Sequence, residues 1–238
     1  MSINIHPAVK SFGRSAWKPI VENGDGPLSA SKFAGLAFVK PDEEYPLCQN
    51  CGKPLQLFVQ LDLDTLPEQL REEFGRGLLQ LFYCVSEKPL CEVECSAFFP
   101  FAKSVVTRII PPETTATAVE RPSFEGAFPP KLIIGWEEME DFPGGDEAES
   151  LGIELDEDEM DALCESGYPL AGDKLAGYPM WVQGIEYPDC PVCGEEMRLL
   201  FQIDSEDNLP FMFGDIGCGH ITQCKTHREQ VAFGWACS

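Results

Sequence analysis

Two sets of cysteine and histidine residues have the spacing of metal ligands. Cys48 and Cys51 form a Cys-x-x-Cys pair followed by glycine, and Cys190 and Cys193 form a second such pair. Zinc prefers four tetrahedral ligands drawn from thiolates and imidazoles, and each pair supplies two thiolates from one tight turn. The glycine after the second cysteine lets the backbone curl so that amide groups point at sulfur. The chain therefore predicts one or two zinc sites.

The remaining ligands of each site lie further along the chain. In the first half, Cys84 follows a predicted strand, and Cys91 and Cys95 compete for the fourth position. Spacing alone leaves this choice open, and we favour Cys91 because the turn before it can return the chain to Cys84. In the second half, Cys224 and His227 complete a Cys3His set. Four protein ligands leave no open coordination position, so we expect the zinc to be structural.

Redox chemistry is the alternative interpretation of a Cys-x-x-Cys pair. A thioredoxin-like pair lies at the start of a helix, whereas each pair here precedes a predicted strand, so metal binding is favoured. We interpret Cys164, Cys218 and Cys237 as small buried residues and His220 as a packed or surface histidine.

The two pairs belong to a longer repeat. With a shift of 142 positions, residues 32–62 align without a gap with residues 174–204, and 12 of the 31 pairs are identical. Unrelated segments share about two identities over such a length. Each copy reads Tyr-Pro-x-Cys-x-x-Cys-Gly and continues into an apolar run that ends in Gln-x-Asp. The repeat predicts a β-rich α+β fold, internally duplicated, with two lobes related by a pseudo-twofold axis.

The expected organisation follows from this repeat. Residues 1–130 form the first lobe, with a lead-in at 1–26 and a Pro-rich connector at 111–130; residues 131–173 form an acidic linker; residues 174–238 form the second lobe. Apolar runs predict strands, and turn and capping residues predict two helices. The expected strands are 55–61, 78–83, 104–110 and 197–203, and the expected helices are 64–74 and 156–163; a further short apolar run lies at 131–136. We expect the lobes to pack through shared apolar faces into one compact body.

The charge of the chain restricts its partners. The formal net charge is −23 over 238 residues, and residues 137–165 carry 14 acidic side chains and no lysine or arginine. Such a field repels nucleic acid phosphates and attracts basic proteins. No apolar run is long enough to span a bilayer, and the N-terminus has no signal-peptide core. We therefore expect a cytoplasmic protein that binds neither nucleic acid nor membrane, in a compartment that keeps its 11 cysteines reduced.

Several motifs resemble the YwqG-like family, a mainly bacterial domain of unknown function. They are Gly-Tyr-Pro-Met-Trp at 177–181, Cys-x-x-Cys-Gly-x-x-Met-x-x-Leu-x-Gln-x-Asp at 190–204, Phe-Gly-Asp-x-Gly at 213–217 and Leu-Leu-Gln-Leu-Phe-Tyr-Cys at 78–84. The resemblance runs from about residue 33 to residue 235. It implies a β-rich, internally duplicated α+β body and no established reaction.

The layout is also similar to programmed cell death protein 2 and its relatives. The matching residues are Gly177, Pro179, Trp181, Cys190, Cys193, Leu199, Gln202 and Cys224. Those proteins act as dedicated chaperones or adaptors for a basic ribosomal protein, so the resemblance implies a chaperone for a basic client. The first copy departs from the pattern, because Ala37 and Val39 stand where proline and tryptophan occur. The acidic linker takes the place of the zinc-finger domain that some relatives carry between their halves.

These observations predict a zinc-stabilised acidic protein-interaction module that binds or chaperones a basic protein. One alternative is an immunity-type inhibitor of a basic toxin. Another is an uncharacterised enzyme with a cleft between the lobes; the chain has no serine-nucleophile elbow, P-loop or dinucleotide fingerprint, so this reading is less favoured. Candidate client contacts are Trp136, Tyr178 and Trp181, and a catalytic cleft would gather Gln60, Asp62, Gln202, Asp204 and Asp215.

Overall fold

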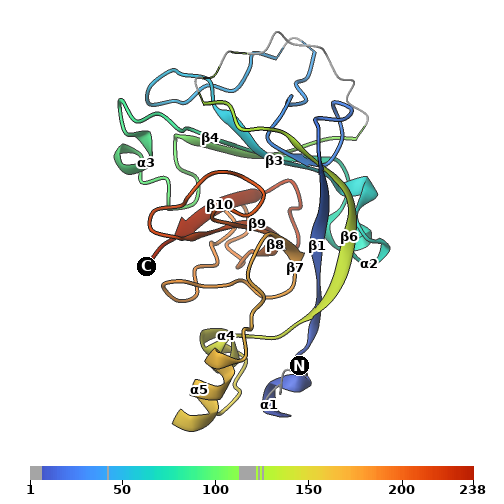
Figure 1. Ribbon diagram of the computed structural model, residues 1–238, viewed down its shortest axis with the longest axis vertical. Helices are drawn as coiled ribbons and strands as arrows, with labels where there is room; N and C mark the ends of the chain where they lie inside the picture. The colour runs from blue at the N-terminus through green and yellow to red at the C-terminus, as the bar shows by residue number, and fades with distance from the viewer. Residues whose placement is uncertain (1–6, 42, 113–121, 123, 125) are drawn as a thin grey trace.

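A single antiparallel sheet organises the chain (Figure 1). The computed structural model describes residues 7–41, 43–112, 122, 124 and 126–238, so much of the expected connector at 111–130 lies outside the described residues. Ten strands pair in the order β10-β9-β8-β7-β1-β6-β2-β3-β4-β5. The helices are short and lie outside the sheet. The fold is therefore β-rich α+β, as the sequence predicts.

The elements have the following bounds. The strands are β1 Arg14–Asn23, β2 Lys32–Phe33, β3 Gln56–Asp62, β4 Leu78–Tyr83, β5 Val105–Ile110, β6 Lys131–Asp141, β7 Lys174–Ala176, β8 Arg198–Asp204, β9 Cys218–Gln223 and β10 Val231–Ala236. The helices are α1 Pro7–Lys10, α2 Glu68–Phe74, α3 Cys91–Glu94, α4 Gly145–Ser150 and α5 Glu157–Glu165, with a 3-10 turn η1 at Leu63–Thr65.

The long pair β1–β6 occupies the centre of the sheet and corrects two expectations. Strand β1 lies in the segment 1–26, which the sequence assigns to a lead-in, and it pairs with β6 along its whole length. Strand β6 begins with the apolar run at 131–136 and continues to Asp141, and all of it lies in the segment that the sequence assigns to an acidic linker. Both strands carry many charged residues, and most of those side chains, with the exception of the buried Asp141, point to solvent, where Ser15 donates a hydrogen bond to Glu138 (2.7 Å). Because one face of such a strand is polar and faces solvent, the strand lacks the continuous apolar run from which other strands are predicted.

The strand order reads symmetrically outward from β1 and β6, and buried glutamines repeat the same contacts on both sides. In β3, the amide oxygen of Gln60 accepts a hydrogen bond from the Phe38 backbone N–H (3.1 Å). In β8, Gln202 accepts from the Met180 backbone N–H (2.8 Å). Each glutamine also donates to two backbone carbonyls in the loop that precedes β2 or β7. The recurring Gln-x-Asp motif is therefore structural, because its glutamine ties β3 or β8 to the loops that precede and follow the short neighbouring strand.

Buried ion pairs lie beside both glutamines. Lys32 is fully buried and donates to the Asp25 carboxylate (2.7 Å), and Lys174, 3% exposed, donates to Asp141 (2.8 Å). Asp141 is 0% exposed, and it also accepts hydrogen bonds from three backbone N–H groups. A buried charge pair of this kind is tolerated because the carboxylate oxygens are satisfied by several donors.

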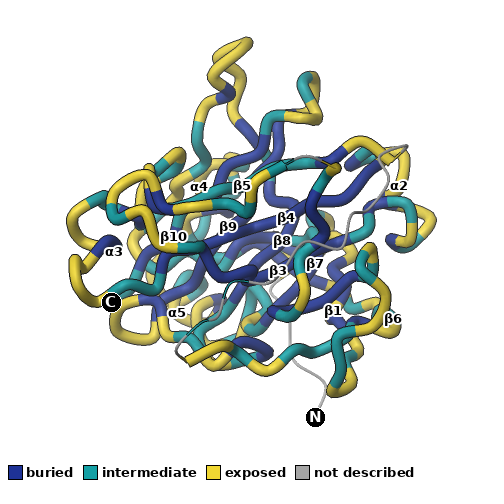
Figure 2. Tube along the Cα trace, turned by 90° about the horizontal axis from the view of Figure 1, so that it is seen from above, coloured by how far each residue is buried: buried dark blue, intermediate teal, exposed yellow. Residues whose placement is uncertain are grey.

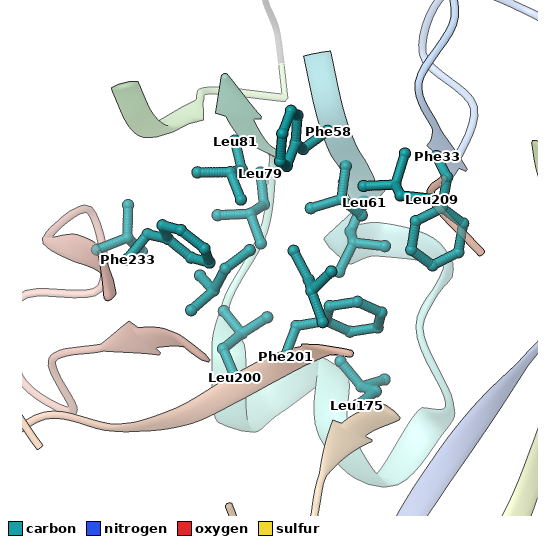
Figure 3. Close-up of a cluster of buried hydrophobic side chains, with 14 of the residues drawn as sticks. Phe33, Phe58, Leu61, Leu79, Leu81, Leu175, Leu200, Phe201, Leu209 and Phe233 are labelled. Carbon is teal, nitrogen blue, oxygen red and sulfur yellow. The ribbon is translucent and has the colours of Figure 1, made fainter. Parts of the chain in front are cut away.

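One hydrophobic core joins both halves of the sheet. Figure 3 shows Phe33, Phe58 and Leu79 from the first half facing Phe201 and Phe233 from the second. The two edge strands, β5 and β10, approach one another, and the Trp235 backbone N–H donates to the Phe98 carbonyl (3.0 Å) in the loop before β5. Viewed from above, the strands form a buried interior surrounded by exposed loops (Figure 2). The expectation that the halves pack through shared apolar faces is confirmed.

The structure contains both helices that the sequence predicts, with shifted bounds. Helix α5 confirms the expected helix at 156–163, and Asp156 and Glu159 form its capping box. The segment expected to form a helix at 64–74 begins as the 3-10 turn η1, which the Asp62 side chain caps, and α2 starts later than expected, at Glu68, without a side-chain cap. In Figure 1, α1, α4 and α5 lie together at one end, where Val9 packs in a small apolar cluster with both acidic helices. None of the helices in the described residues is long and apolar enough to cross a membrane.

Candidate metal centres

Each Cys-x-x-Cys pair lies in its own tight hairpin turn, one before β3 and one before β8, and the two turns have the same form. The Gly52 backbone N–H donates to the Cys48 carbonyl, and the Gly194 N–H donates to the Cys190 carbonyl, each at 2.8 Å. Both glycines have φ near +70°, a conformation that side chains with a Cβ disfavour. The backbone N–H groups of Val192 and its neighbour hydrogen-bond to the Cys190 sulfur, as expected for a ligand turn. The turn therefore presents two sulfurs on one side.

The first centre gathers four cysteines. Cys84, at the end of β4, lies 3.7 Å from Cys51, and Cys91, the first residue of α3, lies 3.8 Å from Cys48, measured between sulfur atoms. All four sulfurs lie within 4.8 Å of one another, and Cys95 is outside this group. Cys95 is the C-cap residue of α3, four positions after Cys91.

The second centre gathers three cysteines and a histidine. Cys224, which follows β9, lies 3.7 Å from Cys193 between sulfur atoms, and its sulfur lies 3.9 Å from Nδ1 of His227. The four ligand atoms lie within 4.8 Å of one another and include Cys190. The structure thus assembles both sets of residues that the sequence selects.

The separations fit a tetrahedral metal. A Zn–S bond of about 2.3 Å places two ligand sulfurs of a tetrahedron about 3.8 Å apart. The separations of 3.7 and 3.8 Å in the two centres match this value. A disulfide requires about 2.05 Å between sulfurs, and every cysteine is a free thiol. Both centres are therefore possible metal sites with a complete set of four ligands.

The protonation of the first centre also suits a cation. Burial acts to raise the pKa of Cys51, but hydrogen bonds from the Lys53 backbone and the other thiols outweigh it and lower the pKa. Burial raises the pKa of Cys91 to about 11 and that of Cys84 well above its ordinary range. Four adjacent thiols cannot all ionise without a positive charge between them, and a bound metal ion would supply that charge.

Polar side chains brace both centres from outside. Asn50 donates to the Cys91 sulfur (3.4 Å) and to the Glu94 carboxylate (3.0 Å), which ties the first hairpin to α3. In the second centre, Glu195 accepts hydrogen bonds from Cys193 (3.7 Å) and from Thr226 (3.0 Å). Such outer contacts orient metal ligands.

The other residues that the sequence singles out are placed differently. Cys218 is buried as expected, whereas Cys164 is exposed on α5 and Cys237 is half-buried. His220 is 5% exposed and packs in β9, in agreement with its interpretation as a packed histidine. The proposed catalytic cleft does not use its two glutamines, because Gln60 and Gln202 are fully buried and engaged in backbone hydrogen bonds.

Among the candidate client contacts, Tyr178 is a core residue. It is 1% exposed, and its hydroxyl donates to the Phe12 carbonyl (2.7 Å). Trp136 is half-buried against the main core. Trp181 is also half-buried, and its indole N–H donates to the buried carboxylate of Glu147 (3.0 Å).

Comparison with known families places these centres in a wider group. The family described as Domain of unknown function (DUF1963) matches residues 31–237. The chain belongs to this family. The match begins just before β2 and ends within the last residues, so both centres lie inside the DUF1963 domain.

A shorter similarity links the chain to one curated protein. It is 44% identical over 39 residues to the uncharacterized protein YpfL of Salmonella typhimurium. The matched stretch covers 16% of this chain and 9% of the length of YpfL. This DUF1963 protein therefore shares a local segment with YpfL.

Proposed function

We propose that this DUF1963 protein is a zinc-stabilised acidic module that binds or chaperones a basic protein. The observation that carries the proposal is the acidic surface along the end of β6, α4 and α5. Of its 14 acidic residues, Asp141 and Glu147 are buried; the other carboxylates lie at the surface, and nearly all of them are exposed. Because the described part of this surface has no basic side chain, its field attracts cations.

The shape of this surface supports the proposal. Helices α4 and α5 project from one end of the sheet (Figure 1), where a partner can approach them from several sides. The capping box of α5 and the apolar contact of Leu163 with Val9 hold the helices in place. A fixed array of carboxylates speeds the encounter with a basic partner more than it adds to affinity.

We infer that the two centres bind zinc in a structural role. Each has four protein ligands, and a closed site of this kind contributes to folding and not to catalysis. Each centre joins a hairpin to a segment that follows the next strand along the sheet: α3 in the first half, and residues 224–227 in the second.

The two halves are, in our proposal, copies of one ancestral unit related by a pseudo-twofold axis. The symmetric strand order, the equivalent hairpins and the glutamine contacts 142 residues apart support this view. The resemblance to programmed cell death protein 2 and its relatives supports a role as a chaperone. A toxin inhibitor would use the same acidic surface, and the identity of the client separates the two roles.

A pull-down from native extract tests the main proposal. We expect the tagged protein to retain a basic protein at low salt and to lose it at about 1 M salt, where the Debye length is about 3 Å. Neutralising exposed carboxylates near and on α5 should remove most of the bound protein, as quantified by mass spectrometry. The substitutions are Glu154→Gln, Glu157→Gln, Asp158→Asn and Asp161→Asn, which leave the capping box intact.

The control neutralises four exposed carboxylates elsewhere: Glu68→Gln, Glu72→Gln, Glu206→Gln and Glu229→Gln. This variant has the same net charge and should retain the client. Equal loss in both variants would attribute binding to net charge and not to the acidic helices. Absence of any partner at low salt would refute the proposal.

The fourth ligand of the first centre gives a separate prediction. We expect Cys91→Ser to lower the zinc content by about one ion per chain, because Cys91 completes the tetrahedron. We expect Cys95→Ser to leave the content unchanged, since Cys95 is outside the group. Zinc measured by mass spectrometry of the purified proteins distinguishes the two, and loss with Cys95→Ser would reverse the assignment.

A further inference from the structure

A cavity of about 220 Å³ lies in the second half, between β9, β10 and the loop before β5. Its walls are largely aromatic, from Trp181, Tyr187, Phe98 and Phe99. The Tyr187 hydroxyl (2.7 Å) and the Trp181 indole donate to the same oxygen of Glu147, which holds the two rings at right angles with centroids 4.9 Å apart. The volume suits one side chain and is small for a cofactor.

The cavity contains an acceptor without a partner. His220 lines it, is 95% buried, and its Nε2 has no hydrogen-bond partner among the described residues. Burial, aided by the charge of Lys174, lowers the pKa of His220 to about 3, so the ring is neutral, and its hydrogen bond to the Met180 backbone occupies the other nitrogen. Nε2 is therefore a buried acceptor that lacks a donor. Glu186 adds a carboxylate at the opening.

The first half shows what fits such a site. There the sheet places Gln60, Gln80 and Arg108 side by side on β3, β4 and β5. The Arg108 guanidinium donates to the Gln80 amide oxygen (2.9 Å) and to Glu43, and it lies over the Phe82 ring at 5.4 Å. The Gln80 amide oxygen on β4, the Glu43 carboxylate in the segment before the first Cys-x-x-Cys hairpin and the Phe82 ring thus surround this arginine.

The second half has the same row without the arginine. Its strands β8, β9 and β10 place Gln202, His220 and Gly234 side by side, so His220 occupies the position of Gln80 and Gly234 that of Arg108. Gly234 has no side chain to fill the space, and Glu186 lies one residue from the position equivalent to Glu43. None of the described residues that line the cavity is a lysine or an arginine.

We propose that this cavity binds the guanidinium group of an arginine from the basic client. This inference rests on the proposed function for the source of the arginine. A guanidinium is planar and weakly hydrated, so it stacks on aromatic rings and donates to several acceptors at once. It would donate to His220 Nε2 and to the Glu186 carboxylate, two acceptors among the residues that line the cavity.

Calorimetric titration with N-acetyl-arginine amide tests the proposal, with the citrulline and lysine analogues as comparisons. We expect the arginine compound to bind about tenfold more tightly than citrulline, its neutral isostere, or lysine. Glu186→Gln should weaken arginine binding about tenfold, whereas Glu229→Gln, which removes an exposed carboxylate outside the cavity, should not. Gly234→Arg should abolish binding by filling the cavity from within.

Gly234→Arg places a Cβ 3.1 Å from the Phe98 carbonyl, so Glu186→Gln decides the result if that variant does not fold. Equal binding of arginine and citrulline, or no binding of arginine, would overturn the proposal. Arginine binding without capture of a basic protein would refute the proposed function and leave the cavity assignment standing. If the protein captures a client equally well with and without Glu186→Gln and does not bind the arginine compound, the cavity assignment is refuted and the proposed function stands.

Discussion

Cys193→Ser is expected to reduce the zinc content from about two ions to about one per chain and to lower the melting temperature by about 10 °C. Serine is a poor zinc ligand, and structural zinc contributes about 10–16 kcal/mol to the folding of zinc-finger peptides. The sheet retains its core in the variant, so we expect a loss of about 3–5 kcal/mol, at about 2–4 °C per kcal/mol for a chain of this size. Metal analysis and calorimetry of the same sample measure both effects.

Cys164→Ser is the matched control, because Cys164 is exposed and lies outside both centres. It should leave the zinc content and the melting temperature unchanged. Chelation of the wild-type protein should produce a larger loss than Cys193→Ser, since both centres are emptied. Wild-type protein that is free of zinc and keeps its full stability would refute the structural role of the metal.

Asp141→Asn is expected to destabilise the protein by about 3–5 kcal/mol, because it leaves the Lys174 ammonium buried without its counter-charge. The carboxylate receives this lysine and three backbone N–H groups, and an amide with one acceptor oxygen cannot replace it. Urea unfolding followed by fluorescence measures the change in the free energy of unfolding.

Two further variants separate charge from local packing at this position. Glu140→Gln neutralises the exposed neighbour of Asp141 and should change the free energy of unfolding by less than about 0.5 kcal/mol. Combining Asp141→Asn with Lys174→Met removes both charges and should recover part of the loss. A double variant no more stable than Asp141→Asn would show that the hydrogen bonds of the carboxylate, and not the unpaired charge, dominate.

The sequence by itself determined the features that depend on neighbouring residues. The ligand hairpins follow from cysteine spacing and from glycines that adopt positive φ, so their residues could be selected without a structure. The strands β3, β4 and β8 follow from apolar runs that must be buried. The capping box likewise marks the start of α5.

Only the tertiary structure decided the features that depend on strand register and on how distant segments dock against one another. Strand β1 has a charged, solvent-facing side, so its central place follows from pairing with β6 and not from its own pattern. The choice of Cys91 over Cys95 depends on how α3 docks beside the first hairpin. The cavity beside Gly234 exists because register aligns His220 with a glycine where the first half aligns Gln80 with Arg108. Such alignments join residues far apart in the chain, and the packing of the whole sheet sets them.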